Sequence, residues 1–293
     1  MIDSFATVAL GQSIAIIAPA GVGKTSLISR VIDSSQADIT VLALVGERSR
    51  EIEEFINRAK KLNSKSFTTI VASSSSASYT ERAQAAETAM AYAEYFRDCG
   101  LRVLLVVDSL TRLARAWRDE ALANGEMPSR QGYPVSVFER LPQILERGGS
   151  TEHGSITALY TMLAREELIE DPLIEEVCSV TDGHLLLSGE MAARGIYPAL
   201  DITKSLSRMQ TTIISKENFE LSRRLRDLIV EYEKNVELIK LSSINSSQTS
   251  PIESRYHKIL TQLTARLDYS SVNELFDEIR SRLNDVLCIK QQA

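Results

Sequence analysis

A turn that contains two glycines and a lysine lies between two apolar segments near the start of the chain. Ile14–Ile17 are typical of a buried strand, Gly21 and Gly23 follow it, and Lys24 opens a segment whose apolar residues have helical spacing. The glycines let successive backbone N–H groups converge on one point, where the helix N-terminus adds partial positive charge. Polyphosphate is the ligand that such a cradle suits.

The side chains of this turn suit a nucleotide and its metal ion. Lys24 would reach the outer phosphates, and the Thr25 hydroxyl would take one coordination position on Mg²⁺. The full phosphate-loop pattern requires glycine where Ala18 stands, so the match covers only its second half, and a chance match in an ordinary loop is the alternative. The preceding strand and the following helix favour phosphate binding, and the predicted loop residues are Ala20, Gly21, Val22, Gly23, Lys24, Thr25 and Ser26.

Two further apolar runs end in acidic residues. The run 39–45 leads into Gly46-Glu47-Arg48-Ser49-Arg50-Glu51, and the run 101–108 ends in Asp108. Ligands of open parallel sheets bind beyond the carboxyl ends of the strands, so we expect Glu47 at the site and Asp108 at the water shell of Mg²⁺. For Asp108, the alternative is an exposed aspartate at a strand end. For the glutamates, the alternative is that they only stabilise a helix N-terminus, and we prefer this interpretation for Glu53 and Glu54.

The remaining pattern indicates an α/β fold followed by a helical region. Further strands are expected at 67–72, 155–162 and 183–187, with helices between them and a short strand within the first twelve residues. The acidic stretch 166–176 is expected to be solvated surface. After Ser215 only helical patterns occur, over 219–241, 252–267 and 272–288, with a polar linker at 242–250. We therefore predict two domains, residues 1–212 and 213–293.

Composition excludes several classes of protein. The 293 residues are 44% hydrophobic and 25% charged, and the net charge of −6 argues against a nucleic-acid groove as the main surface. Three widely spaced cysteines without CxxC spacing favour neither a disulfide framework nor a zinc site, which is typical of a reducing cytoplasm. No window approaches the roughly 18 apolar residues of a spanning helix, and the N-terminus lacks the pattern of a secretory signal.

Six ordered motifs give the chain a specific resemblance to a known family. They read GVGKT, GERSRE, VLLVVDSLTRLARA, PSRQGYPVSVFERLP, RGIYPALDI and SLSR. Over residues 11–236 the chain closely resembles rotary-type hexameric ATPases: the type III secretion system ATPase, its flagellar export counterpart and, more distantly, the β-subunit of the F-type ATP synthase. The GYPVSVFERLP motif and the alanine at position 18 look like the protein-export branch. The resemblance implies a RecA-like P-loop NTPase core with a mainly parallel sheet and an all-α C-terminal domain.

The resemblance also implies roles for residues outside the phosphate loop. Glu47 matches the carboxylate that polarises the attacking water in catalytic subunits, and Arg48 and Arg112 match arginines that line the γ-phosphate pocket. Tyr197 matches the aromatic residue that packs on adenine, and Arg208 matches the arginine finger of a neighbouring subunit. By themselves, Tyr197 would indicate a core or turn residue and Arg208 a surface arginine. The expected cofactors are ATP and Mg²⁺.

One departure from the family bears on assembly. Members carry a β-barrel domain before the phosphate strand that supports the hexameric ring, whereas about ten residues precede Gly11 here. Because an arginine finger acts across an interface, a monomer should be nearly inactive. We therefore expect an intact ATP site with weak, concentration-dependent activity, from a chain that is either truncated or naturally short.

The resemblance implies an ATPase of a bacterial type III secretion apparatus, peripheral to the inner membrane at its cytoplasmic face. The expected partners are further copies of the chain, secretion chaperones and effectors, and the stalk and stator proteins of the apparatus, with no nucleic acid among them. Three alternatives stay open: a flagellar export ATPase, a hexameric nucleic-acid translocase, and a non-catalytic nucleotide-binding module.

Overall fold

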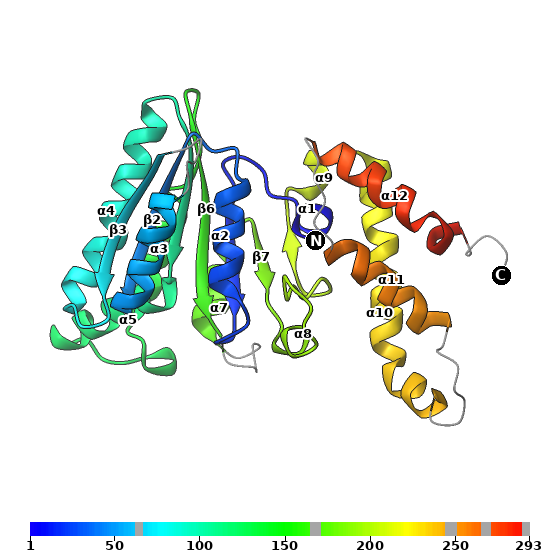
Figure 1. Ribbon diagram of the computed structural model, residues 1–293. Helices are drawn as coiled ribbons and strands as arrows, with labels where there is room; N and C mark the ends of the chain where they lie inside the picture. Colours follow the sequence, from blue (N-terminus) through cyan, green and yellow to red (C-terminus); the bar gives the residue numbers. More distant parts are fainter. Residues whose placement is uncertain (62–66, 165–170, 244–250, 265–270, 289–293) are drawn as a thin grey trace.

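A mainly parallel sheet with helices on both faces forms the larger part of the molecule, and a group of helices lies beyond one edge of it (Figure 1). The computed structural model describes residues 1–61, 67–164, 171–243, 251–264 and 271–288. This arrangement confirms the predicted α/β class with a helical C-terminal region.

The sheet has the strand order β3-β2-β4-β6-β1-β7-β8 in the described residues, and β5 pairs with β6 off this path. All pairings are parallel except those of β5 with β6 and of β7 with β8. The expected buried strands are present, while the two-residue strands β5 and β8 are too short for a sequence pattern to reveal. The strands are β1 (Ser13–Ala18), β2 (Ile39–Glu47), β3 (Phe67–Ser74), β4 (Arg102–Asp108), β5 (Gly149–Ser150), β6 (Ser155–Leu163), β7 (Gly183–Leu186) and β8 (Leu206–Ser207).

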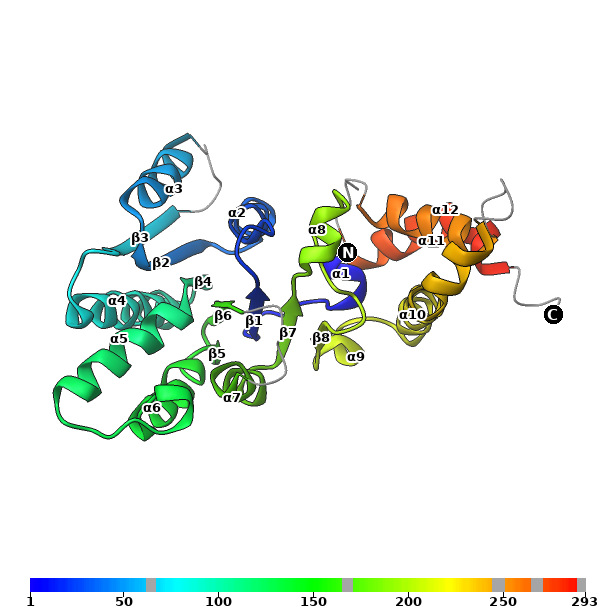
Figure 2. The same ribbon diagram turned by 90° about the horizontal axis from the view of Figure 1, so that it is seen from below.

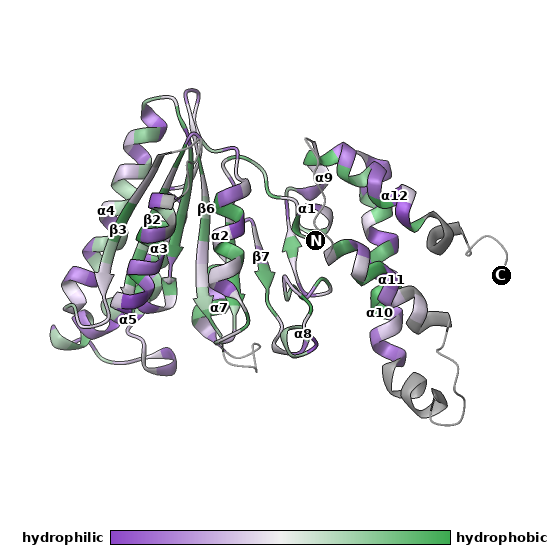
Figure 3. Ribbon diagram, in the orientation of Figure 1, coloured by the Kyte–Doolittle hydropathy of each residue, from purple (hydrophilic) through white to green (hydrophobic). Residues whose placement is uncertain are grey.

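Helices bury both faces of the sheet, as Figure 2 shows. In β1, Ile14 and Ile16 join one hydrophobic cluster, while Ala15 and Ile17 join the other. Because both clusters are apolar, the strands are nearly continuous hydrophobic runs, and the covering helices carry hydrophobic and hydrophilic stripes (Figure 3). One face is covered by α2 (Lys24–Ser34) and α3 (Ser49–Lys61), the other by α4 (Tyr79–Asp98), α5 (Leu110–Ala123), α6 (Val135–Leu145) and α7 (Pro172–Val180).

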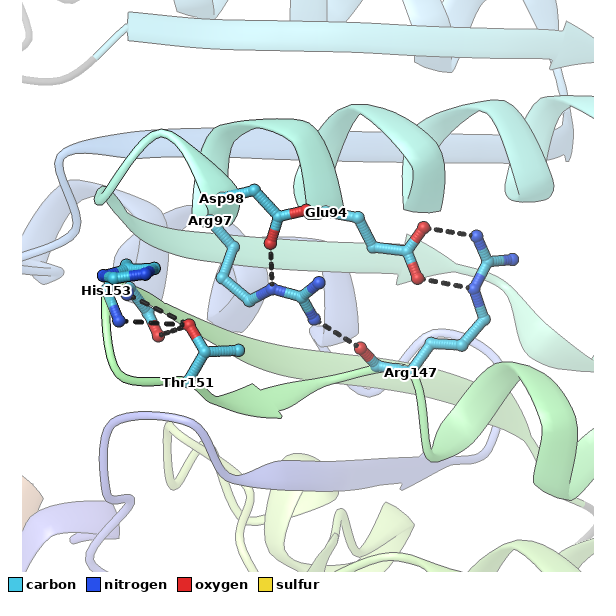
Figure 4. A network of polar contacts seen from close by, with 7 residues as sticks. Glu94, Arg97, Asp98, Arg147, Thr151 and His153 are labelled. Carbon is cyan, nitrogen blue, oxygen red and sulfur yellow. Dashed lines mark hydrogen bonds and ion pairs between the residues drawn. The ribbon is translucent and has the colours of Figure 1, made fainter.

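An ion-pair network at the amino end of β6 holds α4 against the sheet (Figure 4). Arg147 makes a two-pronged contact with Glu94, with Nε–Oε1 at 2.8 Å and Nη2–Oε2 at 2.6 Å. Arg97 donates to the carbonyl oxygen of Arg147 at 3.4 Å and pairs with Asp98. The last turn of α4 is thereby tied to the segment that enters β5.

The first residues form a helix, so the prediction of a short strand there is wrong. Helix α1 (Ile2–Phe5) places the fully buried Phe5 in the cluster that continues into the C-terminal helices. Its carbonyl groups accept hydrogen bonds from that side: Ser4 O from Ser222 Oγ at 2.7 Å, and Phe5 O from Arg226 Nη2 at 3.0 Å. Tertiary contacts therefore decide the conformation of this segment.

The helical region contains α10 (Lys216–Ser243), α11 (Pro251–Thr264) and α12 (Val272–Cys288), close to the expected helices. Short helices α8 (Gly189–Ala193) and α9 (Gln210–Ile213) lie before it. The two-domain division at residue 212 stays a prediction.

The acidic stretch 166–176 is only partly described, because residues 166–170 lie outside the described part. Glu175 is exposed as expected and Glu176 is half-buried, while the apolar Leu173 and Ile174 of the same helix, α7, are buried. The Asp171 carboxylate caps this helix by accepting from the backbone N–H of Leu173 at 2.9 Å, and Pro172 starts it. In the described part of the chain, no helix has the length and apolarity needed to cross a membrane.

Candidate active site

The phosphate loop connects β1 to α2 and is open to solvent. Gly21 and Gly23 have φ angles of 82° and 89°, in the left-handed region where other residues are strained. Val22 is buried between them and anchors the loop, whereas Ala20, Gly21, Thr25 and Ser26 are exposed. The backbone N–H groups at the start of α2 can therefore donate hydrogen bonds to a bound anion.

Three neighbouring strands bring Lys24, Asp108 and Thr161 together. β6 lies between β4, which ends at Asp108, and β1, which leads to Lys24. The Lys24 ammonium pairs with Oδ1 of Asp108, and Asp108 is only 2% exposed. The Thr161 hydroxyl donates to the same Oδ1 at 2.7 Å and lies 3.4 Å from Lys24 Nζ. Lys24 thus neutralises a buried carboxylate.

The oxygen donors beside this cluster fit Mg²⁺. The Thr25 hydroxyl is exposed in the first turn of α2, next to the loop, and the Asp108 carboxylate ends β4, which β6 separates from β1. Mg²⁺ prefers oxygen ligands and keeps several waters, so one hydroxyl and one carboxylate beside bound phosphates suit it.

A second cluster surrounds Glu47 at the end of β2. Glu47 is 4% exposed, and its Oε2 lies 2.9 Å from Arg112 Nη1, which also donates to the carbonyl oxygen of Gly46. Gly46 has a φ of 63°, and a Cβ atom there would lie 3.1 Å from Cδ of Arg82 and 3.5 Å from Cδ of Arg112. Glycine at this position therefore lets two arginines approach the strand end.

The Glu47 carboxyl shares a hydrogen bond with Glu51 in the first turn of α3. Burial, this hydrogen bond and the charge of Asp108 raise the pKa of Glu47 from 4.5 to about 8, and outweigh the opposing charges of Arg112 and Lys24. The same hydrogen bond lowers the pKa of Glu51. In the nucleotide-free protein at neutral pH, Glu47 is thus the protonated partner of the pair.

Because the pKa of Glu47 is raised, the free energy of unfolding should depend on pH, and the Glu47→Gln variant tests this dependence. The stabilisation from protonated Glu47 is complete below pH 4.5 and is lost as the pH rises through about 8. Glutamine mimics the protonated carboxyl, so without nucleotide the variant should have a higher Tm than the wild type at pH 9, with the difference shrinking towards pH 5. Thermal unfolding at both values measures this, with Glu53→Gln on the exposed side of α3 as the control. An equal Tm difference at both values would contradict the raised pKa.

Arg48 and Tyr197 lie at the mouth of the site. The Arg48 side chain is 76% exposed, with Nη1 3.9 Å from Glu51 Oε1. The Tyr197 ring lies over the phosphate loop, because a Cβ atom on Gly23 would be 3.3 Å from Tyr197 Cε1. Beyond Tyr197 is a pocket of about 350 Å³ between the segment 195–197 and α11, lined by Gly195, Ile196, Tyr197, His257, Leu260, Thr261 and Thr264.

The structure does not bring Arg208 to the other predicted site residues. It follows β8 at the sheet edge, where its backbone N–H donates to Asp182 and its Nη2 donates to the carbonyl oxygen of Cys178 at 3.2 Å. The adjacent Gly183 pairs with Ile14 at the amino end of β1, whereas the phosphate loop follows Ala18 at the carboxyl end. At about 3.3 Å per strand residue, Ile14 and Ala18 lie on the order of 13 Å apart.

Three residues of the site were not predicted: Glu51, Arg82 and Thr161. Thr161 carried a usable signal, because it is a polar residue near the carboxyl end of a predicted buried strand, as Asp108 is. Glu51 stood in the same charged run as Glu47 but also fitted an ordinary helix N-terminus. Arg82 lies inside a helix pattern, and only the tertiary packing against Gly46 reveals it.

The parallel sheet, the glycine loop and the lysine–aspartate pair define a P-loop nucleotide-binding protein. The sequence profile of the ATP synthase alpha/beta family, nucleotide-binding domain, matches residues 1–207. The chain belongs to this family.

Two relatives are named for type 3 secretion and for the flagellum. The type 3 secretion system ATPase of Xanthomonas euvesicatoria is 41% identical over 286 residues, which cover 95% of this chain and 65% of the relative. The flagellum-specific ATP synthase of Bacillus subtilis is 39% identical, with coverage of 86% and 58%. The chain spans about half to two thirds of the length of such relatives, from 51% to 65% for the first three.

Solved structures of a secretion ATPase share the RecA-like fold. The assembled ATPase EscN from the type III secretion system of enteropathogenic E. coli is 38% identical, with a TM-score of 0.87 and coverage of 96% of this chain and 69% of EscN. EscN in complex with its central stalk EscO is 37% identical, with a TM-score of 0.83 and the same coverage. The predicted fold and family are therefore confirmed.

Proposed function

We propose that the chain is the catalytic part of a Mg²⁺-dependent ATP hydrolase that energises type III protein secretion. The observation that carries the proposal is the buried Glu47 at a strand end, bonded to Arg112 and adjacent in the sheet to the Lys24–Asp108 pair. A site that only bound nucleotide would need no buried carboxyl there. The relatives named as secretion ATPases support the choice of process.

Phosphoryl transfer to water depends on positioning and on neutralising charge. On ATP binding, Lys24 exchanges Asp108 for the outer phosphates, and the loop N–H groups hold the remaining phosphate oxygens. Thr25 and Asp108 would hold Mg²⁺, which supplies charge neutralisation on the phosphoryl oxygens. Asp108 then keeps a cationic neighbour in both states.

Glu47 positions and polarises the attacking water, and accepts its proton when ionised. Arg112 holds this carboxyl in place from α5. Arg48, exposed at the mouth, and Arg112 face the γ-phosphate once nucleotide is bound. The adenine packs on Tyr197, beside the pocket that residues 195–197 form with α11.

A second copy of the chain completes the site. Arg208 lies too far from its own phosphate loop to contact the γ-phosphate, so it acts as a finger in the site of a neighbour. The flanking Leu206, Met209 and Ile213 are 45%, 40% and 37% exposed. They give this edge exposed apolar surface that another subunit can cover. The assembled homologue supports a homo-oligomer, for which the resemblance to the family implies a hexameric ring.

The physiological work of this ATPase would be to release chaperones from secretion substrates and to unfold the effectors for export. It would act in the cytoplasm at the inner-membrane base of the apparatus, as a peripheral protein. The helical domain, residues 213–293, would contact clients, the stalk and stator proteins, while residues 1–212 carry the ATPase. The stalk complex of EscN supports the stalk as partner. Flagellar export is the second candidate, because a flagellar relative is 39% identical.

Steady-state ATP hydrolysis over a wide range of protein concentration tests the proposal. Turnover should require Mg²⁺, stop in EDTA, and rise in specific activity with concentration, because complete sites need two subunits. No turnover at any concentration would instead indicate a non-catalytic module, and stimulation by nucleic acid would indicate a translocase. Turnover independent of concentration would contradict the shared site.

A further inference from the structure

Thr161 is a buried hydroxyl at the centre of the phosphate-binding cluster. It lies on β6, pairs in register with Ile16 of β1, and is 0% exposed. Its hydroxyl donates to Asp108 Oδ1 at 2.7 Å, and the same oxygen forms the ion pair with Lys24. It therefore connects the strand that leads to the phosphate loop with the strand that carries Asp108.

This contact matters most when Lys24 moves. In the nucleotide-free protein, Oδ1 has two partners among the described residues, the Lys24 ammonium and the Thr161 hydroxyl. If Lys24 turns to the phosphates, Thr161 is the contact that remains on Oδ1, because it is fixed on a buried central strand. A buried carboxylate oxygen left without a partner is costly, and hydrogen bonds to charged groups are stronger than neutral ones.

We propose that Thr161 is a positioning residue that holds the Asp108 carboxylate in its metal-facing orientation while Lys24 transfers to the nucleotide. This inference rests on the proposed roles of Lys24 and Asp108. Thr161 contacts Asp108 and Lys24, and in this proposal it acts on the metal site through Asp108. Its β-branched shape would also fill the core, so the hydroxyl must be tested separately from the shape.

Valine and a second buried threonine separate these two roles. Thr161→Val keeps the branched shape and removes the hydroxyl, whereas Thr161→Ser keeps the hydroxyl. Thr40 on β2 is also 0% exposed, but its hydroxyl has no hydrogen-bond partner among the described residues, so Thr40→Val is the matched control.

The measurement is the affinity for a fluorescent ATP analogue with excess Mg²⁺ and in EDTA. The ratio of the two affinities should fall about tenfold in Thr161→Val, recover in Thr161→Ser and stay unchanged in Thr40→Val. In an Asp108→Asn background, Thr161→Val should cause no further fall, because the two residues act as one unit. If Thr161→Val does not fold, Thr161→Ala takes its place in both backgrounds.

The outcomes distinguish this inference from the proposed function. An unchanged ratio in Thr161→Val, or an equal fall in Thr40→Val, would overturn the role of Thr161 while the wild type still binds and hydrolyses ATP. A further fall in the Asp108→Asn background would overturn the route through Asp108. A wild type without Mg²⁺-dependent nucleotide binding would overturn the proposed function and this inference with it.

Discussion

Replacement of Arg208 by alanine is expected to lower ATP turnover by roughly 10³- to 10⁵-fold, the usual contribution of an arginine finger. The reason is that Arg208 would neutralise charge on the γ-phosphoryl oxygens in the site of the neighbouring subunit. Nucleotide binding to the variant's own phosphate loop should be retained, because Arg208 lies at the opposite end of β1 from that loop. Steady-state hydrolysis at high protein concentration, with fluorescent-nucleotide binding in parallel, measures both effects.

Two controls separate the finger from a general loss of surface charge. Arg208→Lys keeps the charge but loses the planar fork, so it should remain well below the wild-type rate. Arg102→Ala removes another half-exposed arginine at an amino end of the sheet, where it pairs with Asp38, and should leave turnover unchanged.

Mixing variants tests whether the finger acts between subunits. An equimolar mixture of Arg208→Ala and Glu47→Gln should regain turnover, because about one interface in four then joins an intact Glu47 to an intact Arg208. If the mixture stays inactive while the wild type is active at every dilution, the site closes within one chain and the finger in trans is wrong.

Glu47→Gln is the second large effect: kcat should fall by about 10²- to 10⁴-fold. Glutamine keeps the size of the side chain and can stay near Arg112, but it cannot accept the proton of the attacking water. Binding of ATP should therefore persist while turnover is lost. Glu53→Gln, an exposed glutamate on the same helix as Glu51, is the control and should keep the wild-type rate.

The pH profile of the wild type carries the same information. A base must be ionised to act, and burial raises the pKa of Glu47 to about 8 in the nucleotide-free protein. Because kcat/KM reports on the free enzyme, it should rise as the pH increases through about 8. A flat profile between pH 6 and 9, or a Glu47→Gln variant of wild-type kcat, would exclude Glu47 as the base.

Local patterns were sufficient for much of the fold and for part of the site. The buried strands, the glycine loop and the helices that follow are encoded within short windows, and the strands and long helices lie close to the predicted ranges. Because parallel strands end at one edge of a sheet, Lys24, Glu47 and Asp108 could be expected there from sequence alone. The resemblance to the family added Tyr197 and Arg208, which the residues themselves did not distinguish.

Only the tertiary structure decided which side chains touch. Lys24 and Asp108 are 84 residues apart and Lys24 and Thr161 are 137 apart, and no periodicity specifies such contacts. The same holds for Phe5 in α1, which is helical because it packs on helices from the other end of the chain. The sequence by itself determined the phosphate loop and the class of fold, since both follow from local conformational preference. The hydrogen bond of Thr161, the shared proton of Glu47 and the distance of Arg208 from its own loop depend on strand order, which only the packed sheet establishes.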